Sequence, residues 1–279
     1  MSSTFSRTLF RCGIGIIAGF AFAASLTTPA RAAEPVVIGE GLAVTWAQFF
    51  IADTEKLWQK QGLEAESVIF PSGRLVLDAL VGGRVTFGTA AETPVVFSNL
   101  NGLPVRVIAT LHNGGGQAYE PFLLVANQSI QTPKDIKGKR IGYSQGTNAH
   151  YYLSKLLDSV KLKFSDIQAI SLTPSDFVTA TVNGTLDGFI WSEPHISQAL
   201  ALGKGKLHAV ESPGLYKGIS AVITLQSTID QKPELLHKAV QALIAADAEI
   251  RANPDKSIQN VATRVNFDLA LAKDYWPKL

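Results

Sequence analysis

The chain has 279 residues, of which 46% are hydrophobic, 17% charged and 9% aromatic, and its formal net charge is +2. This length and apolar content allow one large hydrophobic core or two smaller ones, and they exclude a disordered chain or a coiled coil. The small net charge provides no electrostatic footprint for nucleic acid or an anionic membrane surface, so neither partner is expected.

Residues 1–32 have the pattern of a cleavable secretory leader, a signal peptide. Two arginines precede an apolar run over residues 13–25, no acidic residue occurs, and residues 30–32 (Ala-Arg-Ala) have the small-x-small form that signal peptidase reads. We predict cleavage after Ala32 and export to the periplasm. Removal of the leader takes away three arginines and no acid, which changes the formal net charge from +2 to −1.

Cys12, the only cysteine, lies within this leader. The exported chain is therefore expected to have no disulfide, no thiolate metal site and no cysteine nucleophile. Cys12 precedes the apolar run, whereas a lipid-anchored cysteine follows one, so a lipoprotein is not predicted. No later stretch reaches the roughly 18 apolar residues that span a bilayer.

Short apolar or β-branched runs alternate with amphipathic helical stretches along the rest of the chain, which predicts an α/β fold. The principal strands are expected at 36–38, 66–70, 105–111, 122–126, 140–143, 169–172, 188–191 and 221–225. The principal helices are expected at 47–61, 75–81, 149–160 and 233–252.

A weak internal repeat indicates two equivalent halves. Residues 79–88 end a helix and start a strand that leads to Glu92, and residues 180–189 do the same before Glu193. In each copy a glycine can end the helix, and the acid follows the carboxyl end of the strand. Open α/β sheets bind ligands outside these ends, so two facing sheets predict a ligand cleft. Chance recurrence of such units is the alternative.

Residues 142–146 (Gly-Tyr-Ser-Gln-Gly) match G-x-S-x-G, the nucleophile elbow of α/β-hydrolases, between a predicted strand and a predicted helix. Residues 112–116 (His-Asn-Gly-Gly-Gly) resemble an oxyanion loop. The alternative function is therefore a secreted serine esterase with Ser144 as nucleophile. Bulky residues directly after the elbow argue against it. Asp187, expected within a strand, and the later histidines also lack the setting of a catalytic triad.

The same turn suits anion binding without catalysis. It joins a strand to a helix, so the first helical amides, the Gly146 backbone and the side chains of Thr147 and Asn148 converge on one point. A helix N-terminus binds anions without a full positive charge. Simple capping of the helix by Thr147 or Asn148 is the alternative interpretation.

Other strand-to-helix turns supply further candidates: a basic residue that can grip an anion, two tryptophans that can wall a cleft, and two repeat-related acids that can hold an ammonium group. The alternative is solvent exposure for the basic residue and core packing for the tryptophans. For the acids it is solvent exposure or pairing with a base. The predicted ligand-binding residues are Trp46, Ser72, Arg74, Glu92, Gln145, Gly146, Thr147, Asn148, Trp191 and Glu193. No metal-ligand spacing, Walker loop or GxGxxG unit occurs, so no metal, cofactor or catalytic residue is predicted.

Several segments, in order and spacing, carry a family resemblance: LDALVGG (77–83), GLPV (102–105), TPKDIKGKRIG (132–142), GTNAHYYL (146–153) and WSEP (191–194). They resemble the ABC-transporter periplasmic substrate-binding proteins for nitrate, taurine and aliphatic sulfonates, a family that also includes thiamine-pyrimidine binders. The resemblance covers nearly all of the chain after the leader.

The resemblance implies a type II periplasmic-binding fold, in which two α/β lobes joined by two crossover strands close on a ligand and dock to an inner-membrane permease. It places the crossovers at 122–126 and 219–225. Lobe 1 then comprises 33–121 and 220–279, and lobe 2 comprises 122–219. In sulfonate and taurine binders the anionic head lies against the turn that corresponds here to Gly146 and Thr147.

The expected function is that of a monomeric solute-binding component of an ABC importer and not of an enzyme. The expected ligand is a small organic anion, an aliphatic sulfonate or taurine first, then nitrate or a thiamine pyrimidine. Glu92 is unexpected beside a bare nitrate or simple alkanesulfonate, so a ligand with a cationic or hydrogen-bond-donor end is expected. Family members commonly extend several tens of residues beyond a Trp-Pro such as 276–277, which raises C-terminal truncation as an interpretation.

Overall fold

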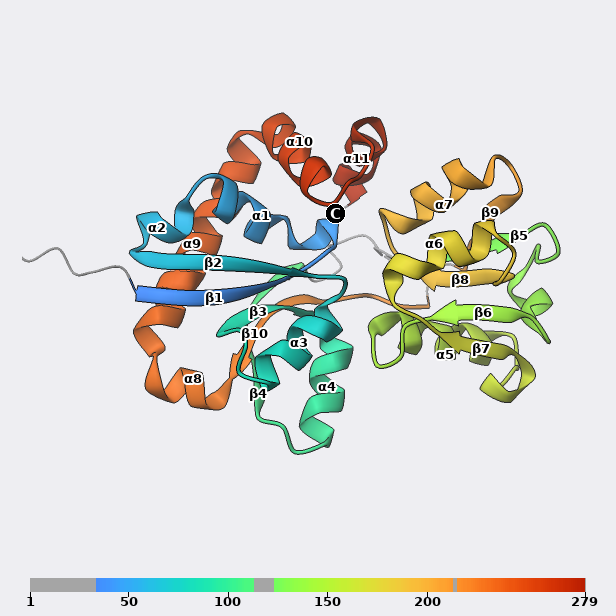
Figure 1. The fold of residues 1–279 in the computed structure, drawn as a ribbon, viewed down its shortest axis with the longest axis horizontal. Coiled ribbons are helices and arrows are strands. Elements are labelled where there is room, and N and C mark those ends of the chain that lie inside the picture. Colours follow the sequence, from blue (N-terminus) through green and yellow to red (C-terminus); the bar gives the residue numbers. More distant parts are fainter. Residues whose placement is uncertain (1–33, 113–122, 213–214, 279) are drawn as a thin grey trace, which may run out of the picture. The chain divides into compact units, whose positions relative to one another are not determined.

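A computed structural model describes residues 34–112, 123–212 and 215–278 (Figure 1). The predicted leader with its cleavage site, the glycines of the predicted oxyanion loop and Phe122 lie outside the described residues. The described chain forms two five-stranded sheets with helices packed on them, which confirms the predicted α/β class. None of its helices is both long enough and apolar enough to cross a membrane.

The elements fall into two stretches of chain. The first contains β1 (Glu34–Gly41), a 3-10 helix (Val44–Trp46), α1 (Ala47–Thr54), α2 (Leu57–Lys60), β2 (Leu63–Phe70), α3 (Gly73–Val81), β3 (Phe87–Ala91), α4 (Glu92–Leu100) and β4 (Val105–His112). The second contains β5 (Leu123–Asn127), β6 (Arg140–Tyr143), α5 (Asn148–Ser159), β7 (Gln168–Ser171), α6 (Pro174–Val182), β8 (Gly188–Trp191), α7 (His195–Gly203), β9 (Leu207–Val210), β10 (Ser220–Leu225), α8 (Gln226–Gln231), α9 (Pro233–Ala252), α10 (Pro254–Arg264) and α11 (Leu269–Tyr275), with short 3-10 helices at Pro133–Ile136, Phe164–Asp166 and Trp276–Lys278.

The two sheets share one topology. The first has the strand order β2-β1-β3-β10-β4 and the second β7-β6-β8-β5-β9. In the first sheet β1 pairs in parallel with β2 and β3, and β10 lies antiparallel between β3 and β4. In the second sheet β6 pairs in parallel with β7 and β8, and β5 lies antiparallel between β8 and β9. The structure therefore confirms the internal repeat, while the predicted lobe boundaries stay a prediction.

The helix-to-strand turns of the repeat have the same geometry in both copies. Gly83 joins α3 to β3 with a φ of 71°, and Gly184 joins α6 to β8 with a φ of 77°. Each glycine N–H donates to the carbonyl three residues earlier, at 3.0 and 3.1 Å. Glycine adopts this left-handed conformation without a steric penalty. These turns bring Glu92 directly after β3 and Glu193 two residues after β8.

Each sheet has its own aromatic core. Trp58 of α2 contacts Phe49 and Phe87 against the first sheet, with ring centroids 5.7 and 5.8 Å apart. Phe177 and Phe189 stack in the second core with centroids 5.3 Å apart. All five side chains are at most 1% exposed, so their burial contributes strongly to the stability of each half.

The first predicted helix, 47–61, is interrupted. α1 ends at Thr54, and Lys56 adopts a left-handed φ of 54° before α2 begins. The break turns Trp58 into the core, where its indole N–H donates to Asp53 at 3.1 Å.

The sequence also did not predict α4, whose outer face carries exposed apolar side chains such as Leu100, 77% exposed. Such a face lacks the polar-out pattern of a typical surface helix.

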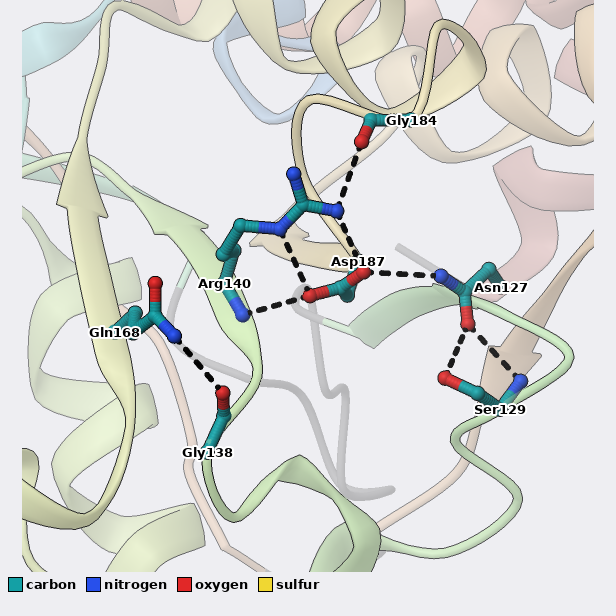
Figure 2. Close-up of polar contacts among 7 residues, drawn as sticks. All are labelled: Asn127, Ser129, Gly138, Arg140, Gln168, Gly184 and Asp187. Carbon is teal, nitrogen blue, oxygen red and sulfur yellow. Dashed lines mark hydrogen bonds and ion pairs between the residues drawn. The ribbon is translucent and has the colours of Figure 1, made fainter.

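An ion pair between Arg140 and Asp187 joins the start of β6 to the start of β8 in the second sheet (Figure 2). Asp187 accepts hydrogen bonds from the Arg140 backbone N–H at 2.9 Å and from Arg140 Nη2 at 2.9 Å. Arg140 Nη2 also donates to the carbonyl of Gly184 at 2.8 Å. Asp187 directly precedes β8, so the expectation that it lies within a strand is wrong. The hydrogen-bonded Arg140 guanidinium lowers the pKa of the Asp187 carboxyl.

Asp187→Asn should lower the free energy of unfolding by about 1 to 2 kcal/mol, towards the lower end because the Arg140 side chain is 38% exposed. The lowered pKa of Asp187 means that its contribution is present above the unfolded-state pKa of about 3.9 and is lost as the pH falls through the folded-state value. Urea titrations of wild type and variant should therefore converge below about pH 4. The exposed Asp158→Asn serves as control; a loss equal to that of the control would show that the ion pair contributes nothing.

Candidate ligand-binding site

A pocket lies where the carboxyl ends of strands from both sheets meet. Residues that follow β1, β2 and β3 of the first sheet, and β6 and β8 of the second, form most of its wall. It encloses about 70 Å³ of space for the centres of water molecules, several times what one water requires. Its lining residues are Leu42, Ala43, Val44, Thr45, Trp46, Pro71, Ser72, Gly73, Arg74, Ala91, Pro94, Thr147, Asn148, Trp191, Ser192, Glu193, Gly218, Ile219, Ser220 and Tyr275.

The structure brings most of the predicted residues to this pocket. The predicted residues that line it are Trp46, Ser72, Arg74, Thr147, Asn148, Trp191 and Glu193. Glu92, Gln145 and Gly146 lie beside it and contact residues of its wall. Sequence reasoning missed Tyr275 and the backbone of 218–220, which reach the pocket from distant segments without a recognisable motif.

The turn before α5 presents backbone donors. The Thr147 hydroxyl donates to the carbonyl of Ser144 at 2.7 Å, so its proton is already used. The Gly146 N–H donates to Nδ1 of His150 at 3.2 Å, and burial lowers the pKa of this histidine. The amides of Asn148 and Ala149 occupy the first turn of α5, where no intrahelical acceptor exists. Within the described chain, these amides are the donors that this turn can offer to an anion.

The turn before α3 presents a second set of donors. Ser72 caps the helix and is 4% exposed, and its Oγ accepts a hydrogen bond from the Leu75 N–H at 3.4 Å. No residue in the described part of the chain accepts a hydrogen bond from its hydroxyl, which can therefore donate to a ligand. The amides of Gly73 and Arg74 begin the helix and have no intrahelical acceptor.

The indole of Trp46 lies against these helix starts. A Cβ on Gly73 would lie 3.0 Å from Cη2 of the indole, so the missing side chain allows the close approach. Trp46 is 7% exposed, and its Nε1 is buried without an acceptor among the described residues. Trp46 lines the pocket, and a buried N–H donor without a partner is costly unless a bound molecule accepts a hydrogen bond from it.

Arg74 connects the two strand-to-helix turns. Its Nε pairs with Asp78 Oδ1 at 3.1 Å, and its Nη1 donates to the Gln145 carbonyl at 3.2 Å. Gly146 has a φ of 77°, and a Cβ on it would lie 2.6 Å from Arg74 Nη1. The guanidinium therefore spans from α3 to the turn before α5. Gly146 is favoured by its backbone conformation, and the absence of a Cβ also leaves room for the Arg74 guanidinium.

Both predicted acids are engaged by protein donors. Glu193 accepts the backbone N–H of Ser197 at 3.0 Å and its hydroxyl at 2.8 Å, which caps α7. Glu92 accepts the Ile219 N–H at 3.0 Å and the Tyr216 hydroxyl. The prediction that these acids hold a cationic group of a ligand stays untested, and each carboxylate already has a role in the protein.

Trp191 forms part of the wall contributed by the second sheet. It is 7% exposed and packs edge-on against His195, with centroids 6.3 Å apart. Burial lowers the pKa of His195 to about 4, so this imidazole is neutral at physiological pH. The pocket wall here is aromatic and uncharged apart from the capped Glu193.

The elbow-like turn shows no catalytic arrangement among the described side chains. No hydrogen bond joins Ser144 Oγ to a histidine there, and Nδ1 of His150 is occupied by the Gly146 amide. Residues 34–112, 123–212 and 215–278 also contain no group of three or more His, Cys, Asp or Glu side chains that could hold a metal ion.

Comparisons with known proteins show which family this chain resembles. Residues 44–257 match the family model described as "NMT1/THI5 like". The chain is 26% identical over 255 residues, 90% of its length and 79% of the relative, to a "Putative aliphatic sulfonates-binding protein" of Escherichia coli (strain K12). It is 32% identical over 148 residues, 52% of the chain and 40% of the relative, to the 4-amino-5-hydroxymethyl-2-methylpyrimidine phosphate synthase of Schizosaccharomyces pombe.

A solved structure shares the fold. The alkanesulfonate-binding protein SsuA from Xanthomonas axonopodis pv. citri, bound to MOPS, superposes with a TM-score of 0.75. The match covers 88% of this chain and 85% of that one at 23% identity. The two sheets described above therefore form a periplasmic-binding-protein fold, as the sequence resemblance implied.

Gly146→Ala should destabilise the chain more than Gly138→Ala. Both glycines have positive φ, 77° and 74°, and each alanine pays about 1 to 2 kcal/mol for that conformation. Only at Gly146 does the new Cβ also displace the Arg74 guanidinium, whereas nothing lies within 4 Å at Gly138. Urea unfolding measures the difference, and in an Arg74→Ala background the two costs should become equal. Equal costs in the wild-type background would contradict the Arg74 contact.

Proposed function

The chain belongs to the NMT1/THI5-like family, and from that premise we propose that it is the solute-binding component of an ABC importer. The proposed ligand is a small organic anion, an aliphatic sulfonate or taurine. The proposed location is the periplasm, and the proposed partner is an inner-membrane permease that receives the ligand from a monomeric binding protein. The function is one of binding, with no catalytic step.

The convergence of helix N-termini on one pocket carries this proposal. The starts of α3 and α5 and the 3-10 helix at Val44–Trp46 all contribute lining residues. Each α-helix N-terminus carries about half a positive elementary charge in its unsatisfied amides. A sulfonate has three oxygens that can each accept from such amides, and the buried Nε1 of Trp46 supplies a further donor.

The remainder of the wall suits the organic part of such a ligand. Trp46, Trp191 and Tyr275 provide aromatic faces, and Pro94 and Ile219 provide aliphatic ones. Ligand pockets typically combine an apolar wall with a few placed polar groups. A bare inorganic anion such as nitrate leaves this apolar wall without a partner, which favours an anion with a hydrocarbon tail.

Binding is tested by thermal unfolding of the chain with ethanesulfonate, taurine, nitrate and a thiamine pyrimidine. A ligand at 100 times its Kd adds about 2.7 kcal/mol to the free energy of unfolding. We expect the sulfonates to raise the melting temperature, and isothermal titration then gives the affinity. A sample that melts cooperatively at the same temperature with every sulfonate would contradict the proposal.

Trp46→Phe should weaken sulfonate binding about tenfold or more, because a hydrogen bond to a charged group is worth about 1.5 to 3 kcal/mol. The substitution keeps an aromatic ring and removes the Nε1 donor. Trp58→Phe is the matched control, since Trp58 is fully buried and donates to Asp53 away from the pocket. It should lower stability and leave affinity unchanged. An unchanged affinity in Trp46→Phe, measured by titration calorimetry, would remove the indole N–H from the site.

A further inference from the structure

We propose that Glu92 is a positioning residue that fastens the second sheet to the first across the pocket, without touching the ligand. Its carboxylate orients Asn148 in the pocket wall and holds the segment that leads into β10. In this way Glu92 determines the fraction of molecules in which the two halves, each a sheet with its packed helices, are closed on the pocket. The affinity part of this inference rests on the proposed function, whereas the part on closure does not.

The carboxylate of Glu92 accepts hydrogen bonds from two distant parts of the chain, the start of α5 and the segment 216–219 that leads into β10. Glu92 begins α4, directly after β3 of the first sheet. Its Oε2 accepts the backbone N–H of Ile219 at 3.0 Å and Nδ2 of Asn148 at 3.4 Å. Its Oε1 accepts the hydroxyl of Tyr216. Asn148 begins α5 of the second half, so a single side chain joins elements of both sheets.

Tyr216 closes this network. Its hydroxyl also accepts a hydrogen bond from Asn148 Nδ2 at 2.6 Å, so both Asn148 and Glu92 bond to one phenol oxygen. The Tyr216 side chain is 6% exposed and packs in the core of the second sheet. Burial and the adjacent Glu92 carboxylate raise the pKa of Tyr216, so its hydroxyl keeps the proton that it donates to Glu92.

The network includes part of the pocket wall, but Glu92 itself does not line the pocket. Asn148 and Ile219, which bond to Glu92, line the pocket, whereas Glu92 and Tyr216 do not. A ligand therefore contacts residues whose positions Glu92 fixes. This arrangement explains why an acid follows β3 without requiring a cationic group on the ligand.

Separation of the two sheets would break part of the network. Tyr216 belongs to the second core and Asn148 to α5, whereas Glu92 belongs to the first sheet, so opening removes two of its donors. Water replaces them in the open state, which limits the preference for closure to a modest factor. Since apparent affinity scales with the fraction of competent closed molecules, a loss of this preference weakens every ligand equally.

The closure part is tested on the ligand-free chain by electron–electron distance measurement between two spin labels. Glu64→Cys on β2 and Asn183→Cys after α6 place one label on each half at exposed positions. Cys12, in the predicted leader, is the only native cysteine, so in the chain without residues 1–32 the labels report on the introduced pair alone. Glu92→Gln and Tyr216→Phe are compared with wild type and with the exposed control Glu234→Gln.

We expect both variants to shift the distance distribution from the shorter towards the longer population by at least a factor of three, and the control to match wild type. Tyr216→Phe keeps the test decisive if Glu92→Gln fails to fold, which the melting curve reveals. Distributions identical to wild type in the folded variants would overturn the proposal.

The affinity part uses ethanesulfonate and taurine, which differ by one amino group. In Glu92→Gln both should bind more weakly by the same factor, chiefly through faster dissociation. A loss confined to taurine would overturn the proposal, because it would show that Glu92 contacts the ammonium group. If neither compound binds wild type, the proposed function fails for these ligands, and the spin-label distances still decide whether Glu92 holds the halves together.

Discussion

Parallel strand pairing is the constraint on which the rest of this structure depends. Because β1 pairs in parallel with β2 and β3, and β6 with β7 and β8, the carboxyl ends in each sheet lie at one edge. Every helix that follows such a strand begins at that edge, with its unsatisfied amides exposed there. The antiparallel β10 begins at the same edge, which brings Ser220 to the pocket. The donors of the site thus follow from topology before any side chain is considered.

Several local features adapt this edge to bind a ligand. Gly73 allows the indole of Trp46 to lie on the start of α3, and Gly146 allows Arg74 to bridge to the turn before α5. The charged groups near the pocket are largely satisfied within the protein: Arg74 pairs with Asp78, and Glu193 caps α7. Recognition of the proposed anion would therefore fall mainly to neutral donors. Backbone amides that are held in place by the helices move little when the ligand binds. Because they are neutral, the pocket also contains no large uncompensated charge when it is empty.

The sequence predicted those features of the fold and site that arise from local patterns. The bounds of β6 and β8 and of α9 agree with the predicted ranges, because glycine and proline mark their ends. The turn at 146–148 was recognised for the same reason. The repeat predicted two equivalent sheets, and strand order confirms it.

The hydrogen-bond partners of the site could not be predicted, because they come from distant segments. Glu92 bonds to Tyr216 and Ile219, which lie 124 and 127 residues further along the chain. No local pattern in the sequence connects either residue to Glu92, so the sequence left the acid free to be assigned to a ligand. A nearby partner can also be missed. The Thr147 hydroxyl donates to the Ser144 carbonyl only three residues away, but the backbone conformation of the turn determines this bond and the sequence does not show it.

The central claim is that the helix starts around this pocket hold the head of an organic anion while the aromatic wall covers its tail. A crystal structure of the chain soaked with 2-bromoethanesulfonate tests it most directly, because anomalous scattering locates the bromine independently of the sulfonate. The account predicts sulfonate oxygens within hydrogen-bond distance of the Asn148 and Gly73 amides, with the bromine between Trp46 and Trp191. A bromine at the helix starts, or a sulfonate bound outside the pocket, would contradict it.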